Sequence, residues 1–151
     1  MKISINTDDK CTETEIMVIC NHLSDDIEKL LAAIRMWDMK LTGRKDGRQY
    51  ILEAADIVYI DSIEKHTFLY ASTGVYETPF KLYELETKLA CRDFIRASKN
   101  SLLNINHIQF IEPAVDRRLI LKMTGDIELV VSRQYSAAVK EKLEVYNGNG
   151  K

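Results

Sequence analysis

The alternation of hydrophobic and polar residues near the N-terminus predicts two short strands followed by a helix. Ile3 and Ile5 alternate with polar neighbours, and a second alternating stretch follows at residues 16–20. Ser24 then occupies a position typical of a helix N-cap, ahead of apolar residues at helical spacing. These apolar positions are Ile27, Leu30, Leu31, Ile34 and Trp37. We therefore predict a β-β-α unit over residues 1–39, which is too short to fold alone and must pack against the rest of the chain or against another subunit.

Residues 40–151 predict a mainly β domain with short helices. Asp46-Gly47 is a dipeptide typical of tight hairpins, and it separates predicted strands at residues 40–45 and 48–52. Further strands are predicted at residues 57–61, 66–71, 75–77, 94–97, 108–111, 119–123 and 127–131. Because most of these strands follow one another without an intervening helix, we expect mainly antiparallel sheets.

Two helices are predicted within this domain. Thr78-Pro79 combines a capping residue with proline at the first helical position, so it predicts a helix start. The buried side of this helix is expected to carry Leu82, Leu85 and Leu89. Ser132 is the predicted N-cap of a final helix. The apolar side of that final helix is expected to carry Tyr135, Val139 and Leu143.

Charge is distributed unevenly along the chain. The 21 basic and 23 acidic residues give a formal net charge of −2. Residues 1–39 contain four basic and eight acidic residues, so residues 40–151 have a net charge of +2. The overall charge therefore does not exclude a polyanionic partner. The sequence has no run of about 18 apolar residues and no secretory signal at its N-terminus, so we expect a cytoplasmic protein.

The sequence lacks the motifs that mark common enzymes. It contains no nucleotide-binding glycine loop, no zinc-protease motif and no serine-hydrolase elbow. His22, His66 and His107 lie far apart, and no nucleophile stands with a base and an orienting group. Cys20 and His22 could share a metal ion, but two ligands without a second pair more often mean an ordinary small apolar cysteine. We therefore expect no catalysis, no cofactor and no metal.

Basic residues recur at predicted loops and strand ends, a placement that favours nucleic-acid binding. The positions, with two polar neighbours, are Lys65, His66, Arg96, Lys99, Asn100, Arg117, Arg118 and Arg133. Any one of them alone is more often simply solvated. Together, cations on short loops can reach phosphates and groove edges.

Four blocks of sequence, in this order, closely resemble the LytTR DNA-binding domain of bacterial transcription regulators. The blocks read ADIVYIDS, KLYELETKL, FIRASKNSLLNINHI and GDIELVVSRQY, and they begin at family-like intervals. With the residues around them they cover positions 40–146. The resemblance implies a LytTR-like fold of short antiparallel sheets with small helices. It also implies DNA binding through loops and strand edges, and not through a helix laid in the groove.

The resemblance assigns the DNA contacts to three places. The first holds Lys65 and His66, with Thr67 as the alternative one residue further along. The second is the pair Lys99 and Asn100, and the third is Arg133. Arginine can read a guanine edge with two hydrogen bonds, whereas Lys99 can meet guanine or a phosphate.

Three further positions in these blocks are expected to have other roles. Asn104 matches a family asparagine, and we expect it to fix a turn locally. Tyr135 shares a helix side with Val139, so we expect it in the core. Ser101 stands where many relatives carry a larger side chain, which predicts a looser interface at that point.

The resemblance therefore implies a sequence-specific transcriptional regulator that binds repeated sites in double-stranded DNA as a homodimer. Residues 1–39 are shorter than a receiver domain of about 120 residues, so we expect no receiver. This short extension resembles that of small stand-alone LytTR proteins, which implies a second partner, a small membrane protein encoded nearby. The alternative is a protein-interaction module with weak or no DNA binding, which the acidic extension and the net charge of −2 favour.

Overall fold

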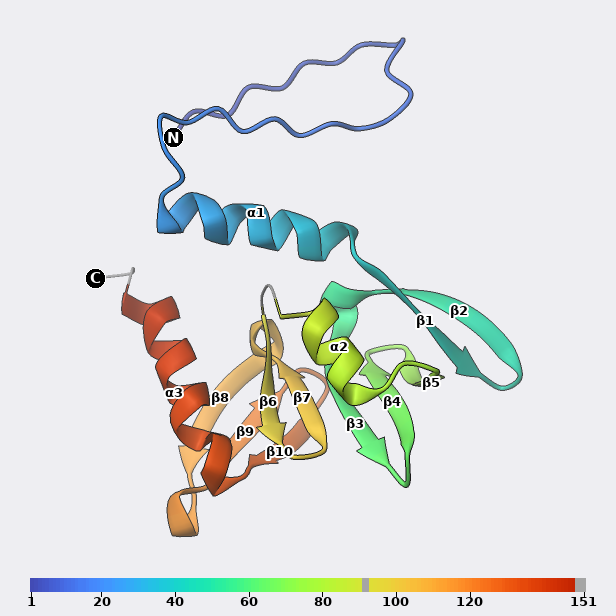
Figure 1. The fold of residues 1–151 in the computed structure, drawn as a ribbon, viewed down its shortest axis with the longest axis vertical. Helices are drawn as coiled ribbons and strands as arrows, with labels where there is room; N and C mark the ends of the chain where they lie inside the picture. The colour runs from blue at the N-terminus through green and yellow to red at the C-terminus, as the bar shows by residue number, and fades with distance from the viewer. Residues whose placement is uncertain (91–92, 149–151) are drawn as a thin grey trace.

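The computed structural model describes residues 1–90 and 93–148 (Figure 1), and the side chains of these residues except 36–38 and 145–148. The predicted place of the Trp37 side chain thus lies outside the described residues. In the described residues, ten strands form two antiparallel sheets, which confirms a mainly β fold. The larger sheet has the order β2-β1-β5-β4-β3-β7-β6, and the smaller sheet has the order β10-β9-β8. None of the described helices is long and apolar enough to span a membrane.

The strands of the two sheets lie close to the predicted positions. The larger sheet contains β1 (Lys40–Lys45), β2 (Arg48–Glu53), β3 (Ile57–Ile63), β4 (His66–Ala71), β5 (Gly74–Thr78), β6 (Phe94–Ser98) and β7 (Ser101–Asn104). The smaller sheet contains β8 (Ile108–Pro113), β9 (Leu119–Met123) and β10 (Ile127–Val131). The β1–β2 hairpin turns at Asp46 and Gly47, whose φ angles of 51° and 75° are both positive, as the tightest hairpin turns require.

Strand β7 was not predicted, and its burial explains why. Leu102 packs in one hydrophobic core and Leu103 packs in the other. A strand that is buried on both faces shows no alternation of apolar and polar residues. The short segment SLLN therefore lacks the pattern that identified the other strands.

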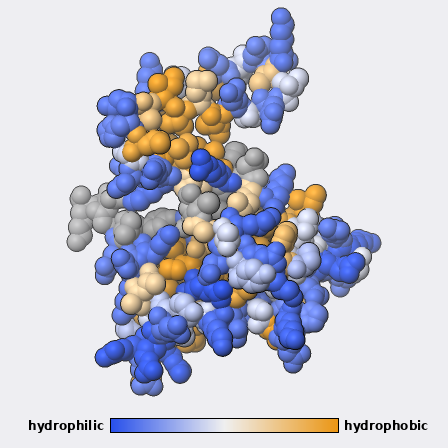
Figure 2. Space-filling view, viewed as in Figure 1, coloured by the Kyte–Doolittle hydropathy of each residue, from blue (hydrophilic) through white to orange (hydrophobic). Residues whose placement is uncertain are grey.

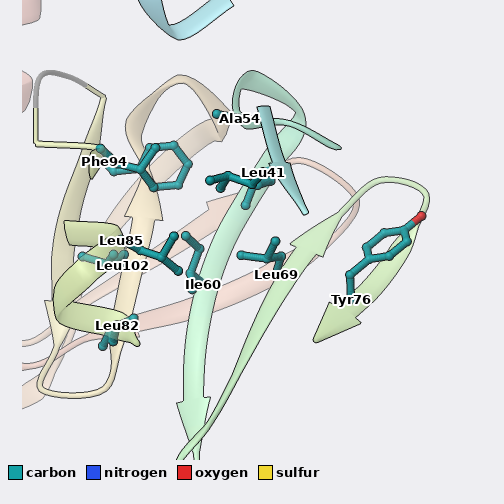
Figure 3. Packing of buried hydrophobic residues seen from close by; sticks show 11 residues of the cluster. Leu41, Ala54, Ile60, Leu69, Tyr76, Leu82, Leu85, Phe94 and Leu102 are labelled. Atoms are coloured by element: carbon teal, nitrogen blue, oxygen red, sulfur yellow. The ribbon is translucent and has the colours of Figure 1, made fainter. Parts of the chain in front are cut away.

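Two hydrophobic cores cover the two faces of the larger sheet. The first core, shown in Figure 3, contains Leu82 and Leu85 of α2 (Leu82–Lys88) together with Ile60, Leu69 and Leu102 of the sheet. The second core joins the larger sheet to the smaller sheet and to α3 (Arg133–Gly148). Its buried residues include Val58, Leu103, Leu121, Val131 and Val139. Each sheet is therefore held by side chains that reach it from another layer.

The helix α2 begins three residues later than predicted. Thr78 is still the last residue of β5 and is paired with Thr67 of β4, so Thr78-Pro79 belongs to the end of the sheet. Lys81 takes the N-cap position, and its backbone N–H donates to Glu84 Oε1 at 3.1 Å. The predicted buried positions are correct, because Leu82, Leu85 and Leu89 are all buried.

The helix α3 begins where the sequence predicts. The backbone N–H groups of Tyr135 and Ser136 donate to the Ser132 carbonyl at 3.0 and 3.1 Å, so Ser132 is the N-cap residue. Its side chain does not cap the helix, because Ser132 Oγ is buried without a hydrogen-bond partner. Tyr135 and Leu143 pack against the second core and Val139 is buried in it, which confirms the predicted apolar side.

The N-terminal residues 1–24, called the head segment below, differ from the prediction. The helix that follows them, α1 (Asp25–Asp38), is present, and Ser24 Oγ accepts a hydrogen bond from the Ile27 N–H at 3.4 Å. The head segment contains a turn in which Cys11 N–H donates to the Asp8 carbonyl at 3.0 Å, but it contains no strand. Residues 1–17 are all exposed, and two arms with nothing to pack against make a marginal hairpin at best. The predicted β-β-α unit is therefore represented by its helix alone.

Candidate nucleic-acid interface

Two of the predicted contact regions are neighbouring hairpin tips. Glu64 and Lys65 form the tip between β3 and β4, with φ angles of 49° and 69°. Lys99 and Asn100 form the tip between β6 and β7. Strands β3 and β7 are neighbours in the sheet, and Ser62 N–H donates to the Asn100 carbonyl at 2.8 Å. The two tips therefore lie next to each other at one edge of the molecule.

Arg133 is brought to the same edge from a distant part of the chain. Ser132, the residue before it, donates its backbone N–H to the Ala97 carbonyl at 2.9 Å. Ala97 lies in β6, two residues before Lys99, so the start of α3 is held beside the β6–β7 tip. Arg133 itself is exposed. Figure 1 shows the two tips and the start of α3 along the lower edge, which we call the contact edge.

At the β3–β4 tip, the exposure of the side chains distinguishes the predicted contact residues from the alternative contact. Lys65 and His66 are exposed, whereas Thr67, the alternative contact, is 2% exposed. The register of β4 and β5 sets Glu77 opposite Phe68. His66 Nδ1 lies 2.6 Å from Glu77 Oε1, so this carboxylate fixes the orientation of the imidazole ring. Sequence reasoning did not identify Glu77, because its proximity to His66 depends on the strand register.

Arg96, one of the cations noted in the sequence, is used inside the protein. Its Nε forms a short hydrogen bond and ion pair with Glu86 of α2. Its Nη1 donates to the Lys99 carbonyl at 2.6 Å, which anchors the β6–β7 tip to the helix. The guanidinium therefore supports the tip and is not free to contact DNA.

The β6–β7 tip is further fixed by two serines. Ser98 Oγ and Ser101 Oγ lie 2.8 Å apart, and Asn100 N–H donates to Ser98 Oγ at 3.1 Å. The small side chain at position 101 thus takes part in a hydrogen bond within the hairpin. Lys99 and Asn100 remain exposed on this rigid turn, and rigid placement is what a base-reading side chain needs.

Asn104 has a wider role than the predicted local turn. Its Oδ1 accepts the Asn106 N–H at 3.1 Å, which is the expected local bond. Its Nδ2 also donates to the Ile57 carbonyl at 2.9 Å, which ties β7 to the start of β3. Asn104 is fully buried, and it lies at the end of β7 away from the contact edge.

Two side chains on β3 have shifted pKa values. Burial raises the pKa of Tyr59, and the neighbouring Tyr70, whose ring stacks on Tyr59 at a centroid distance of 4.0 Å, raises it further. Burial also raises the pKa of Asp61, partly offset by a backbone hydrogen bond from Ser62.

Among the described residues, no group of three or more histidine, cysteine, aspartate or glutamate side chains could hold a metal ion. Cys20 and His22 are both exposed, and His22 Nδ1 lies 2.9 Å from Asn21 Oδ1.

Comparison with known proteins identifies the domain. The family model of the LytTr DNA-binding domain matches residues 47–144. This chain belongs to the LytTR family. A LytTr DNA-binding domain of a putative methyl-accepting/DNA response regulator from Bacillus cereus has the same fold, with a TM-score of 0.66 and 23% identity over 69% of this chain and 95% of that chain.

Two relatives of the LytTR chain are named as regulators. An uncharacterized HTH-type transcriptional regulator of Staphylococcus aureus strain MSSA476 is 28% identical over 96% of this chain and 99% of its own length. The transcriptional regulatory protein YpdB of Escherichia coli O6:H1 is 34% identical over 59% of this chain and 37% of its own length. In the part of the chain that the structure describes, five strands separate α1 from α2 and five separate α2 from α3, so these helices form no helix-turn-helix.

Proposed function

We propose that this LytTR protein is a sequence-specific transcriptional regulator that reads double-stranded promoter DNA along the contact edge. The observation that carries the proposal is the convergence of the β3–β4 tip, the β6–β7 tip and the start of α3. These three elements are exposed and carry basic side chains, and backbone hydrogen bonds hold them side by side. Family membership and the names of the two relatives support the same reading.

Each predicted contact residue has a chemical role in this proposal. Arg133 donates two parallel hydrogen bonds to a guanine edge, and Asn100 reads a neighbouring base. Lys65 and Lys99 bind phosphates or guanine, and His66 contacts the groove beside them. Figure 1 shows α3 running away from the contact edge, and Val139 in its middle is buried in the second core, so only the start of α3 lies at the edge. The proposal includes no catalytic step, cofactor or metal. Because bacterial promoter DNA lies in the cytoplasm, we expect the protein to act there.

Fluorescence anisotropy with DNA from the region upstream of the gene tests this proposal. We expect binding that depends on sequence, with the logarithm of the affinity falling linearly as the logarithm of salt concentration rises. A shuffled duplex of the same composition is the control. No binding down to about 50 mM salt by correctly folded protein would contradict the proposal and would favour the alternative, a protein-interaction module.

We also propose that residues 1–39 form a dimerisation unit attached to the DNA-binding domain of residues 40–151. The head segment exposes six large apolar side chains beyond Met1: Ile3, Ile5, Ile16, Met17, Ile19 and Leu23. Figure 2 shows a hydrophobic patch over the head segment and α1. We propose that a second copy of the chain covers this patch. A dimer suits a regulator of repeated half-sites, because it holds two contact edges at a fixed spacing that can match the spacing of the half-sites on DNA.

Light scattering after gel filtration tests this dimer. We expect the wild type to be dimeric and Ile5→Lys/Ile19→Lys to be monomeric with the circular dichroism spectrum of the folded wild type, because both side chains are exposed in the single chain. A matched control is Lys2→Ile/Lys10→Ile, which should remain dimeric. A monomeric wild type would contradict the dimer and would direct attention to the other candidate partner, a small membrane protein encoded nearby.

A further inference from the structure

The contact edge continues beyond Arg133 to a fourth hairpin tip. The turn between β8 and β9 contains Val115, Asp116, Arg117 and Arg118, and all four residues are exposed. Leu119, the next residue, is paired with Val131 of β10, two residues before Arg133. The segment Val115–Arg117 also contacts α3. Figure 1 shows this turn, in orange, at the lower edge next to the start of α3.

The order of the four elements along the edge follows from the sheet pairings. The β3–β4 tip is followed by the β6–β7 tip because β3 is paired with β7. The start of α3 comes next through the bond between Ser132 and Ala97. The β8–β9 tip comes last through the pairing of β9 with β10. The β8–β9 tip therefore lies on the side of Arg133 that faces away from His66.

The β8–β9 tip is a fixed structure. Ala114 N–H donates to the Arg118 carbonyl at 3.0 Å, and Arg118 N–H donates to the Val115 carbonyl at 3.4 Å. Asp116 and Arg117 both have positive φ angles, of 60° and 63°. Two consecutive residues with positive φ are the geometry of a tight hairpin turn, and the β3–β4 tip has the same geometry at Glu64 and Lys65.

The side chains of this tip suit the sugar-phosphate backbone of DNA. Arg117 and Arg118 supply two adjacent guanidinium groups, and arginine matches phosphate geometry with paired donors. None of the ion pairs among the described residues involves either arginine. Asp116 is the carboxylate within the turn, so the tip keeps a net positive charge. Val115 is 83% exposed, which offers an apolar surface for the sugar edge beside the phosphates.

We propose that the β8–β9 tip is a fourth DNA-contacting element, which binds backbone phosphates on the side of Arg133 away from His66. This inference rests on the proposed function and extends its footprint. Contacts to phosphates position a protein on DNA without reading its sequence. The tip therefore contributes affinity and register, whereas base reading is left to Arg133 and the β6–β7 tip.

Charge removal at the tip tests the proposal. For Arg117→Gln/Arg118→Gln we expect affinity to fall by the same factor on cognate and shuffled DNA, roughly five- to tenfold per lost phosphate contact at about 0.1 M salt. The slope of log affinity against log salt should become shallower by about 0.9 for each lost contact. The ratio of cognate to shuffled affinity should stay unchanged. The matched control is Lys140→Gln/Lys142→Gln, which removes two positive charges from the later turns of α3, away from the contact edge, and should leave the slope as it is.

Shortening the DNA locates the contact. We use a duplex with one half-site and remove base pairs stepwise from the end that lies beyond Arg133, under the β8–β9 tip. We expect the affinity of the wild type to fall to that of Arg117→Gln/Arg118→Gln. The same removal should not weaken that variant further. Val115→Asp is a second probe, because an exposed tip tolerates the change and a carboxylate facing phosphates should reduce affinity.

The outcomes separate this inference from the proposed function. Wild-type protein that binds cognate DNA, with tip variants that match it in affinity and salt slope, would overturn the fourth contact and leave the regulator proposal standing. A selective loss on cognate DNA would also overturn it, because the tip would then be reading bases. Absence of wild-type binding would instead remove the proposed function itself.

Discussion

Replacing Arg133 with alanine is expected to weaken binding to the cognate site by about 1–3 kcal/mol and to relax discrimination at one base pair. Arg133 is exposed at the start of α3, and the bond from Ser132 to Ala97 holds it beside the β6–β7 tip. A guanidinium in that position can bind both acceptors of a guanine edge, which no other base presents in the same arrangement. Anisotropy titrations on the cognate duplex and on single-base variants of it measure both effects.

The lysine variant separates base reading from simple charge. Arg133→Lys keeps the positive charge but loses the planar pair of donors, so it should retain binding to shuffled DNA while losing most of the discrimination. Lys140→Ala is the matched control, because Lys140 is an exposed cation seven residues further along the same helix. Equal cognate binding by Arg133→Ala and wild type would show that Arg133 does not read a base.

The sequence predicted most of the fold because most strands carry a visible pattern. The hairpin at Asp46-Gly47 and strands β3 and β4 follow from turn chemistry and from β-branched or aromatic residues. Strand β7 was missed because Leu102 and Leu103 are both buried, in different cores. The reverse error occurred in the head segment, where Ile3 and Ile5 alternate with polar residues but have no neighbouring core. The alternation of apolar and polar residues indicates which face of a strand is apolar. It does not show whether the fold provides a surface against which that face can pack.

The sequence predicted which segments carry the candidate contact residues, but it did not predict how the fold brings these segments together. Lys99 and Arg133 are 34 positions apart in the sequence, and a backbone bond between two other residues brings them together. Arg96 resembled a free cation, yet its guanidinium is directed to Glu86 and to the Lys99 carbonyl. The pairing of His66 with Glu77 depends on strand register alone. Which cations are exposed at the contact edge and which support the fold is therefore decided by strand register and helix placement, and neither has a local sequence signal.

Two asparagines of the β6–β7 hairpin provide the sharpest test of this division between contact and support. Asn104→Ala is expected to lower the free energy of unfolding by about 2–4 kcal/mol, because it leaves two partners unpaired in the interior. These partners are the Ile57 carbonyl and the Asn106 N–H, bonded to Asn104 at 2.9 and 3.1 Å. Urea unfolding measures the loss, and an unchanged denaturant slope shows that the same folded state is being compared. DNA affinity of the folded variant should match the wild type, because Asn104 is buried away from the contact edge.

Asn100→Ala is expected to show the opposite pair of effects. Asn100 is exposed, and its bonds within the fold are made by its backbone, through the carbonyl to Ser62 and the N–H to Ser98 Oγ. Truncating the side chain should therefore change the unfolding free energy by no more than about 0.5 kcal/mol. Loss of a base contact should weaken cognate binding by about 1–3 kcal/mol. If Asn100→Ala destabilised the protein as much as Asn104→Ala, or bound cognate DNA as tightly as wild type, the β6–β7 tip would be a structural turn and the reading of DNA would have to lie elsewhere on the edge.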